Sequence, residues 1–237
     1  MNRKSAFLTT TMGVCLTAMV CCALWGSAFP CIKIGYQLFQ IDGNDISSQL
    51  LFAGCRFTLA GLLTILIGSL MNRRPLIPRK TSWIRIAKLS LFQTVIQYLF
   101  FYVGLAHTTG VKASIIEASN VFVAILIASL IFRQEKLDKH KIIGCIAGFA
   151  GVVLININQS GLDMSLSLTG EGFILLSTIA YAVSSVLIKI YSREDNPVML
   201  SGWQFLLGGI IMILCGYLTG GSVSVWTCLL YTSDAAD

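Results

Sequence analysis

Three charged side chains, Lys33, Arg56 and Glu117, stand inside apolar stretches of the sequence. An ionised group is costly in the hydrocarbon core of a bilayer unless it meets an opposite charge or water. Such residues are therefore candidates for function. We expect Glu117 to pair with Arg56 or Lys33, and the single positive charge left over suits an anionic or zwitterionic small molecule. A purely structural ion pair is the alternative.

Uncharged polar residues on neighbouring apolar stretches have helical spacing. Gln93 and Gln97 are four residues apart, and Glu117 and Asn120 are three apart, so each pair shares one face of a helix. We expect these faces to line a cavity, with hydrogen bonding between helices as the alternative. The candidate substrate-binding residues are Trp25, Pro30, Lys33, Arg56, Gln93, Gln97, Glu117, Asn120, Tyr181, Lys189 and Gln204.

The segment WGSAFPCIK, residues 25–33, ends the first apolar stretch. Pro30 has no N–H to donate and its ring crowds the preceding turn, so we expect the helix to bend near Gly26 beside a cavity or hinge. Simple helix packing is the alternative. Lys33 lies near the end of this stretch, where its long stem could instead lift the ammonium to the interface. Lys189 has a similar position in a later stretch.

The composition is that of a membrane protein. Of 237 residues, 55% are hydrophobic and 12% are charged, and the mean hydropathy is +0.78. A soluble domain of this length needs more surface charge. Apolar runs of roughly 20 residues recur, each long enough to cross a bilayer as a helix. We predict an all-α polytopic protein with seven spanning helices, at residues 10–34, 49–71, 86–106, 113–132, 142–157, 172–191 and 198–218.

Basic residues between the expected helices gather on one side of the membrane. Thirteen Lys and Arg residues fall on that side, and Lys112 alone falls on the other. The positive-inside rule then places the amino terminus in the cytoplasm and residues 36–48 and 158–171 outside. The expected location is the inner (plasma) membrane, with the lipid bilayer as a partner. Because orientation accounts for the basic clusters, nucleic acid is not an expected partner.

Two segments recur in the same order. WGSAFPCIKI (25–34) matches YAVSSVLIKI (181–190) at an offset of 156, and GCRFTLAG (54–61) matches GWQFLLGG (202–209) at an offset of 148. The first span thus matches the sixth, and the second matches the seventh. Since five spans are an odd number, the second copy must enter the membrane from the other side, as in inverted-repeat transporters. We predict a ten-helix 5+5 protein, with residues 1–157 as the first copy and 158–227 as part of the second.

The two ends of the sequence differ in character. The opening MNRK leads into an apolar stretch that is too long for a cleaved signal, so the first helix should remain as an anchor. The last ten residues, CLLYTSDAAD (228–237), resemble the translation of a sequencing-library adapter. We interpret them as an artefact and expect the natural chain to continue beyond Thr227.

Several motifs resemble a known family. The first two are WGSAF with Lys33 downstream, and GCRFTLAG. The third is the segment of residues 104–155, which begins with GLAHTTGVKASI and ends with LIFRQEKLDKHKIIGCIAGFAGVVLI. These motifs are similar to EamA-type members of the bacterial drug/metabolite transporter superfamily, over residues 10–218. One departure is Asn120, where the fourth span of the family usually has proline. The resemblance implies two five-helix bundles around a central cavity and gradient-driven export of small metabolites or amino-acid-like compounds.

Other functions fit less well. A membrane enzyme is disfavoured because His107 and His140 lie at span ends and no histidine and acid have metal-ligand spacing, so we expect no catalytic residue, metal or cofactor. A seven-span receptor is suggested by the span count alone, and a channel would show flux that does not saturate. Gly144, Gly148 and Gly151 form a small-residue face on the fifth span. Its partner lies either within the chain or in a second subunit, which would make a homodimer.

Overall fold

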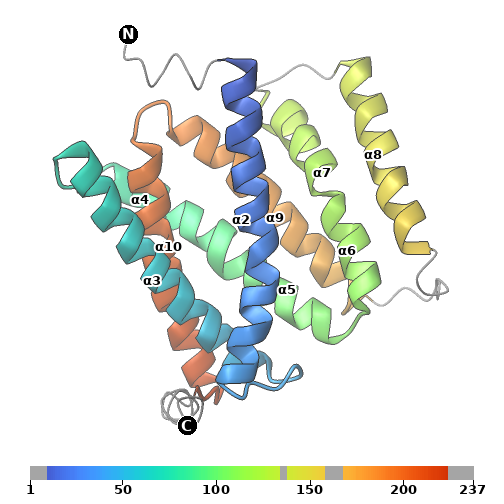
Figure 1. Ribbon diagram of the computed structural model, residues 1–237, viewed down its shortest axis with the longest axis horizontal. Coiled ribbons are helices and arrows are strands. Elements are labelled where there is room, and N and C mark those ends of the chain that lie inside the picture. Colours follow the sequence, from blue (N-terminus) through green and yellow to red (C-terminus); the bar gives the residue numbers. More distant parts are fainter. Residues whose placement is uncertain (1–9, 134–137, 158–167, 224–237) are drawn as a thin grey trace. The chain divides into compact units, whose positions relative to one another are not determined.

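The computed structural model describes residues 10–133, 138–157 and 168–223. Within these ranges it omits the side chains at 25, 26, 28–30, 33, 110, 111, 152, 153 and 155–157. All regular elements of the described residues are helices (Figure 1), which confirms the all-α class. The chain divides into two units, an N-terminal unit of residues 1–43 with 223–237 and a main unit of residues 44–222. The segment interpreted as an artefact, 228–237, lies outside the described residues.

The N-terminal unit contains one long helix, α2 (Thr11–Leu38), at the place of the first predicted span. The Thr10 hydroxyl caps its start by accepting a hydrogen bond from the Gly13 N–H at 3.2 Å. The helical backbone continues past Pro30 to Leu38. Phe39, the residue after the helix, caps its end by donating its N–H to the Gly35 carbonyl. Most of the described side chains of α2 are exposed.

The main unit contains the remaining helices. The helical stretch at each predicted span begins and ends within four residues of the predicted bounds. Among the described residues, five helical segments are long and apolar enough to cross a membrane: Ile46–Asn72, Ser82–Ala106, Lys112–Ile131, Glu171–Tyr191 and Pro197–Leu218. The seven spans and the ten-helix repeat stay predictions. The elements are α3 (Ile46–Asn72), α4 (Ser82–Leu89), η1 (Ser90–Ile96), α5 (Gln97–Ala106), α6 (Gly110–Ala118), α7 (Asn120–Leu126), η2 (Ile127–Ile131), α8 (Lys139–Ile157), α9 (Glu171–Tyr191) and α10 (Pro197–Leu218).

Two spans are not regular α-helices. The third passes from α4 into the wider π-helical turns of η1 and then into α5, and the fourth breaks at Ser119 between α6 and α7 before ending in η2. At the break, the Ser119 hydroxyl donates to the Ile116 carbonyl at 2.6 Å. Wider turns and breaks of this kind re-aim side chains and often occur at functional sites. Both irregular spans carry predicted binding residues.

The helices of the main unit pack in a defined order. α3 lies against α10, and α10 lies against α4 and η1. The third span then contacts α9 through η1 and α5, α9 contacts α6 and α7, and α8 contacts α6 (Figure 1). Because α9 touches both the third and fourth spans, it holds the centre of this unit, and Ile174, Ala182 and Ser184 on it are completely buried.

Glycines bring α3 and α10 into backbone contact. A Cβ atom at Gly61 would lie 2.5 Å from the Leu206 nitrogen, and one at Gly209 would lie 2.5 Å from the Thr58 nitrogen. These glycines belong to two rows with seven-residue spacing, so they face the partner helix at every second turn. The rows are Gly54, Gly61 and Gly68 on α3, and Gly202, Gly209 and Gly216 on α10.

The contacts at this crossing are related by the offset of 148 that separates the two matching sequence segments. Two of these contacts have counterparts between the matching residues. Gly54 contacts Ile213, and their matches Gly202 and Ile65 also contact each other. In the same way, Gly61 contacts Leu206, and their matches Gly209 and Thr58 are in contact. Phe57 and Phe205 match each other, and their rings stack on one another with centroids 5.6 Å apart and planes at 14°.

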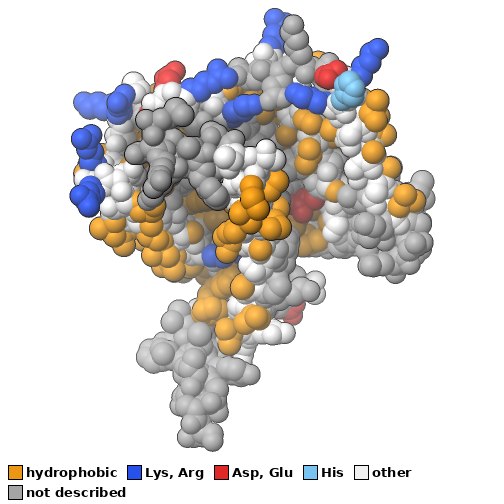
Figure 2. All heavy atoms as spheres, turned by 45° about the horizontal axis from the view of Figure 1, so that its top comes forward, with side chains coloured by type: hydrophobic (Ala, Val, Ile, Leu, Met, Phe, Trp, Pro, Cys, Tyr) orange, Lys and Arg blue, Asp and Glu red, His pale blue; other side chains and the backbone are white. Residues whose placement is uncertain are grey.

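One end of the main unit is rich in Lys and Arg, which Figure 2 shows along the upper edge of the view. We call this the basic end; α3 finishes there, and α4 and α10 begin there. Asp195, in the turn between α9 and α10, accepts hydrogen bonds from the Ser82 hydroxyl at 2.8 Å and the Arg85 guanidinium at 2.7 Å. Arg85 also pairs with Glu194. Burial alone would raise the pKa of Asp195, but the bonds from Ser82 and Arg85 outweigh it, and the pKa lies below its usual value.

A second charge cluster fastens the opposite end of the main unit. The buried carboxylate of Glu171, in the first turn of α9, accepts a hydrogen bond from the Thr108 hydroxyl at 2.8 Å and lies 3.2 Å from the Lys112 ammonium. A carboxylate at this position also interacts favourably with the positive end of the helix dipole. Just before it, a Cβ at Gly170 would lie 2.5 Å from the His107 carbonyl oxygen, so the α5–α6 turn and the start of α9 are in backbone contact.

Replacing Gly61 with alanine should weaken the α3–α10 crossing. The new methyl group would meet the backbone of Leu206 and Gly202, neither of which can move without separating the helices. We expect the free energy of unfolding to fall by about 1–3 kcal/mol, the usual cost of overpacking. Thermal unfolding of the purified protein in detergent measures the change.

Gly144→Ala is the matched control, because a Cβ at Gly144 on α8 has no described atom within 4 Å. It makes the same chemical change inside a helix and should be neutral or stabilising, by up to about 1 kcal/mol, through helix propensity. Equal destabilisation by the two variants would show that the close crossing of α3 and α10 is not the cause.

Asp195→Asn should destabilise the basic end. The variant removes a buried charge that accepts two hydrogen bonds, and hydrogen bonds to charged groups contribute about 1.5–3 kcal/mol each. Because the folded-state pKa of Asp195 is lowered, its contribution is present above the unfolded pKa and is lost as pH falls through the folded pKa. The difference in melting temperature between wild type and variant should therefore be largest near neutral pH and shrink below about pH 4.

The control for this experiment is Asp138→Asn, which removes an exposed carboxylate beside His140. Its melting temperature should follow that of the wild type across the whole pH range, since exposed pairs contribute little. A difference between wild type and Asp195→Asn that stayed constant down to pH 3 would contradict the role given to the Asp195 charge.

Candidate functional site

Three of the predicted binding residues lie on α2, in the N-terminal unit. They are Trp25, Pro30 and Lys33, and their side chains lie outside the described residues. Whether Lys33 reaches Glu117 or the interface therefore stays a prediction. The other eight predicted residues lie on helices of the main unit.

Tyr98 is the centre of a polar group inside the main unit. Its hydroxyl, on α5, lies within electrostatic range of Arg56 on α3, Glu117 on α6 and Tyr181 on α9, and also of Tyr102 one turn further along α5. Four spans therefore each contribute a titratable side chain to one region. We call these five residues the interior polar group.

Arg56 and Glu117 do not form the direct ion pair that the sequence suggested, in the part of the chain that the structure describes. The guanidinium of Arg56 instead lies over the ring of Phe57, 5.0 Å from its centroid. A cation is attracted to the face of an aromatic ring, which offsets part of the cost of taking the charge out of water. The two opposite charges are thus both within electrostatic range of Tyr98 without forming a direct pair.

Aromatic rings form one wall beside the interior polar group. The rings of Phe57 and Tyr98 meet edge to face, with centroids 4.7 Å apart, and Tyr98 and Tyr102 lie 6.2 Å apart. Phe205 stacks against Phe57. Aromatic edges and hydroxyl groups together provide a surface that can contact both apolar and polar parts of a ligand.

Three predicted amides contribute buried oxygen atoms. The side-chain oxygens of Gln93, Gln97 and Asn120 are buried and accept no hydrogen bond from any described residue. Gln93 lies in η1, Gln97 begins α5, and Asn120 follows the break at Ser119, so all three sit at irregular points of their spans. Buried polar atoms in native proteins normally have a partner, and these oxygens can accept hydrogen bonds from a ligand or water.

Gln204 lies in a different place, between α10 and η1. Its side chain is completely buried, and neither its amide oxygen nor its nitrogen is bonded to a described residue. Ser82 contacts Asp195 and Thr94 contacts Gly208, at offsets of 113 and 114 residues, so α4–η1 and α10 run parallel. At this offset Gln204 lies level with Ser90.

Lys189 and Trp203 lie apart from the interior polar group. Lys189 is exposed in the last turn of α9, near the basic end. Trp203 on α10 donates its indole N–H to the Leu76 carbonyl at 2.8 Å and meets Trp83 edge to face, 5.1 Å away. Lys189 thus belongs to the surface near the basic end, and Trp203 fastens the α3–α4 loop to α10 there.

Sequence reasoning missed three polar residues of the interior. Tyr102 joins the interior polar group, and its position four residues after Tyr98 was the available signal. Ser90 and Thr94 are also almost completely buried, with hydroxyls that have no described partner. Their spacing of four residues places them on one face of η1, but single hydroxyls in apolar stretches are too common to stand out.

The arrangement suits binding rather than covalent chemistry. The interior polar group brings a cation, a carboxylate and phenol hydroxyls together beside aromatic rings, a set that can hold a small molecule with charged and apolar parts. Among the described residues, no group of three or more His, Cys, Asp or Glu side chains could hold a metal ion.

Several proteins are similar to this chain. A WAT1-related protein, chloroplastic, of Arabidopsis thaliana is 27% identical over 218 residues, covering 90% of this chain and 50% of that protein. An uncharacterized transporter of Archaeoglobus fulgidus is 31% identical, covering 83% of this chain and 64% of its own length. The uncharacterized transporter YvbV of Bacillus subtilis is 24% identical, covering 89% and 65%. The chain thus spans from half to just under two thirds of these relatives. No solved structure matches it.

The family comparison covers most of the chain. Residues 12–157 and 168–233 match the EamA-like transporter family. The matched residues include every helix described above, apart from the first residue of α2. The relatives with descriptive names are named as transporters, in bacteria and archaea alike. The chain belongs to the EamA-like transporter family.

Proposed function

We propose that this protein is a secondary transporter that moves small anionic or zwitterionic molecules across a membrane by alternating access, driven by a gradient. Export of metabolites or amino-acid-like compounds is the direction we favour, because the sequence resembles EamA-type exporters. The interior polar group would bind the substrate, with Arg56 meeting a carboxylate and Glu117 meeting an ammonium.

The convergence on Tyr98 carries this proposal. Arg56, Glu117 and Tyr181 come from three different spans, and all three lie within electrostatic range of the Tyr98 hydroxyl on the third span. Charged residues within membrane-spanning helices are tolerated where they face a binding site or a water-filled path. The break in the fourth span at Ser119, two residues after Glu117, adds backbone groups of the kind that transporters use for binding.

The contacts of α3 and α10 support the inverted repeat. In a structure with two matching halves related by a two-fold axis, every contact has a counterpart between the exchanged residues. The contacts of Gly54 and Gly61 have such counterparts, and the stacked pair of Phe57 and Phe205 is its own counterpart. We therefore propose that α3 and α10 are equivalent helices on either side of such an axis, in a ten-helix protein.

The charge distribution supports the orientation. The basic end carries most of the described Lys and Arg residues (Figure 2). Lys112, which pairs with Glu171 in the first turn of α9, lies near the opposite end. We propose that the basic end faces the cytoplasm of a plasma membrane, with the amino terminus on the same side.

Transport by the reconstituted full-length protein tests the function. Proteoliposomes preloaded with unlabelled alanine should take up labelled alanine by counterflow that saturates with concentration, which a channel would not show. Arg56→Gln and Glu117→Gln should each lower the rate at least about tenfold, since each removes a charge that the substrate would meet.

The control variant is Lys88→Gln, which removes an exposed cation on α4. It should transport like the wild type, and all variants should keep similar melting temperatures. Unchanged counterflow in both Arg56→Gln and Glu117→Gln would remove the interior polar group as the binding site. Uptake that rises linearly with concentration would favour a channel.

A further inference from the structure

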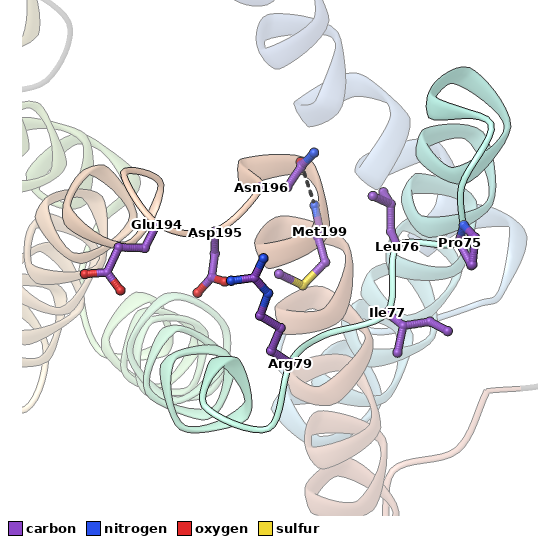
Figure 3. Close-up of a pocket in the computed structure, with 8 residues that line it drawn as sticks. All are labelled: Pro75, Leu76, Ile77, Arg79, Glu194, Asp195, Asn196 and Met199. Atoms are coloured by element: carbon purple, nitrogen blue, oxygen red, sulfur yellow. Dashed lines mark hydrogen bonds between the residues drawn. The ribbon is translucent and has the colours of Figure 1, made fainter.

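A hollow at the basic end lies away from the interior polar group. It has a volume of about 170 Å³ and lies between the loop that joins α3 to α4 and the turn that joins α9 to α10 (Figure 3). One side is apolar, formed by Pro75, Leu76, Ile77 and Met199, and the other is polar, formed by Arg79, Glu194, Asp195 and Asn196.

The apolar wall is held in place by hydrogen bonds. The Leu76 N–H donates to the Ser69 hydroxyl at 3.1 Å, and the Leu76 carbonyl accepts from the Trp203 indole at 2.8 Å. Leu76 is thus fixed to both α3 and α10, and Pro75 beside it restricts the backbone further. The hollow is therefore formed in advance, which lowers the entropic cost of binding.

The hydrogen bonds described for the polar wall do not involve the Arg79 guanidinium, which interacts with Asp195 only electrostatically. Asp195 is bonded to Ser82 and Arg85, and the Asn196 carboxamide oxygen caps α10 by accepting from the Val198 and Met199 N–H groups. Figure 3 shows the Arg79 guanidinium reaching toward the space beside Asp195 and Met199. Among the described residues it forms no ion pair within 4.0 Å. Its donors are available to an acceptor that enters the hollow.

The surface around the hollow is strongly cationic and partly apolar. Six basic residues lie between positions 73 and 88, against the two carboxylates of Glu194 and Asp195, so four positive charges are in excess. Ile77 and Ile84 expose 72% and 65% of their surface, and Trp83 exposes 40%. Since this surface lies where the membrane-crossing helices end, it is at the level of lipid head groups. The basic residues are Arg73, Arg74, Arg79, Lys80, Arg85 and Lys88.

We propose that this hollow binds the phosphate group of an anionic phospholipid, with Arg79 as its main contact. The phosphodiester accepts hydrogen bonds from the guanidinium, and the glycerol and the start of an acyl chain lie along Leu76, Ile77 and Met199. A soluble phosphate would use the same guanidinium but not the apolar wall. The lipid therefore fits both walls, and its binding would connect the α3–α4 loop with the α9–α10 turn.

Tryptophan quenching by brominated lipids tests this proposal, because Trp83 and Trp203 stand beside the hollow. The purified full-length protein is reconstituted in bilayers that mix phosphatidylcholine with phosphatidylglycerol, with bromine on one lipid at a time. We expect phosphatidylglycerol to be preferred near these tryptophans by about fivefold. Arg79→Gln should abolish most of the preference, and Arg79→Lys should keep a large part of it.

Lys139→Gln is the matched control, since it removes one exposed cation at the start of α8 and does not line the hollow. It should leave the preference unchanged. Equal quenching by the two lipids in the wild type would overturn the proposal, as would an equal loss in Lys139→Gln and Arg79→Gln. Removal of the preference by 10 mM inorganic phosphate, but not by 10 mM chloride, would assign the hollow to a soluble phosphate instead.

Discussion

The main unit depends on the close approach of α3 and α10. In a bilayer, helices gain little from hiding apolar side chains, because lipid is equally apolar, so association rests on van der Waals contact and hydrogen bonds. Glycines at seven-residue spacing allow the two backbones to touch along most of their length. α10 also packs against η1, where Gly208 contacts Thr94. The same helix therefore positions the third span. The interior polar group then depends on that placement, since Tyr98 lies two residues beyond η1.

Charge is used differently at the ends and in the interior. At the ends, Asp195 and Glu171 each form short bonds with neighbours from distant parts of the chain, and these bonds fasten turns to helices. In the interior, Arg56 and Glu117 both lie within electrostatic range of Tyr98 but do not form a direct pair. Satisfied charges stabilise one arrangement, whereas charges that still have bonding capacity can take part in binding. The chain thus keeps its rigid ion pairs away from the region proposed to bind substrate.

The sequence predicted where the helices lie along the chain far better than which helices contact one another. Span positions follow from hydrophobic length, and the helix bounds lie within four residues of the expected ones, because polar loops end each apolar run sharply. The match of Gly54 and Gly61 to Gly202 and Gly209 was visible, but nothing in it indicated that these helices touch each other. α3 is apolar on nearly all sides, so periodicity could not tell which face meets protein. The surroundings of Tyr98 and the bond between Arg85 and Asp195 arise from tertiary packing between residues 19 to 110 positions apart, which local spacing does not encode.

The stacked rings of Phe57 and Phe205 have a consequence for how such a chain could arise. Each ring touches its own match, which is the geometry that identical subunits show on a dimer axis. On the proposed repeat, a single ancestral five-helix polypeptide inserted in both directions could have formed the same stack with a second molecule of itself. Gene fusion would then have needed no new contact at this crossing. Later divergence, such as Arg56 in one copy where the other has Gln204, could give the two halves different chemistry.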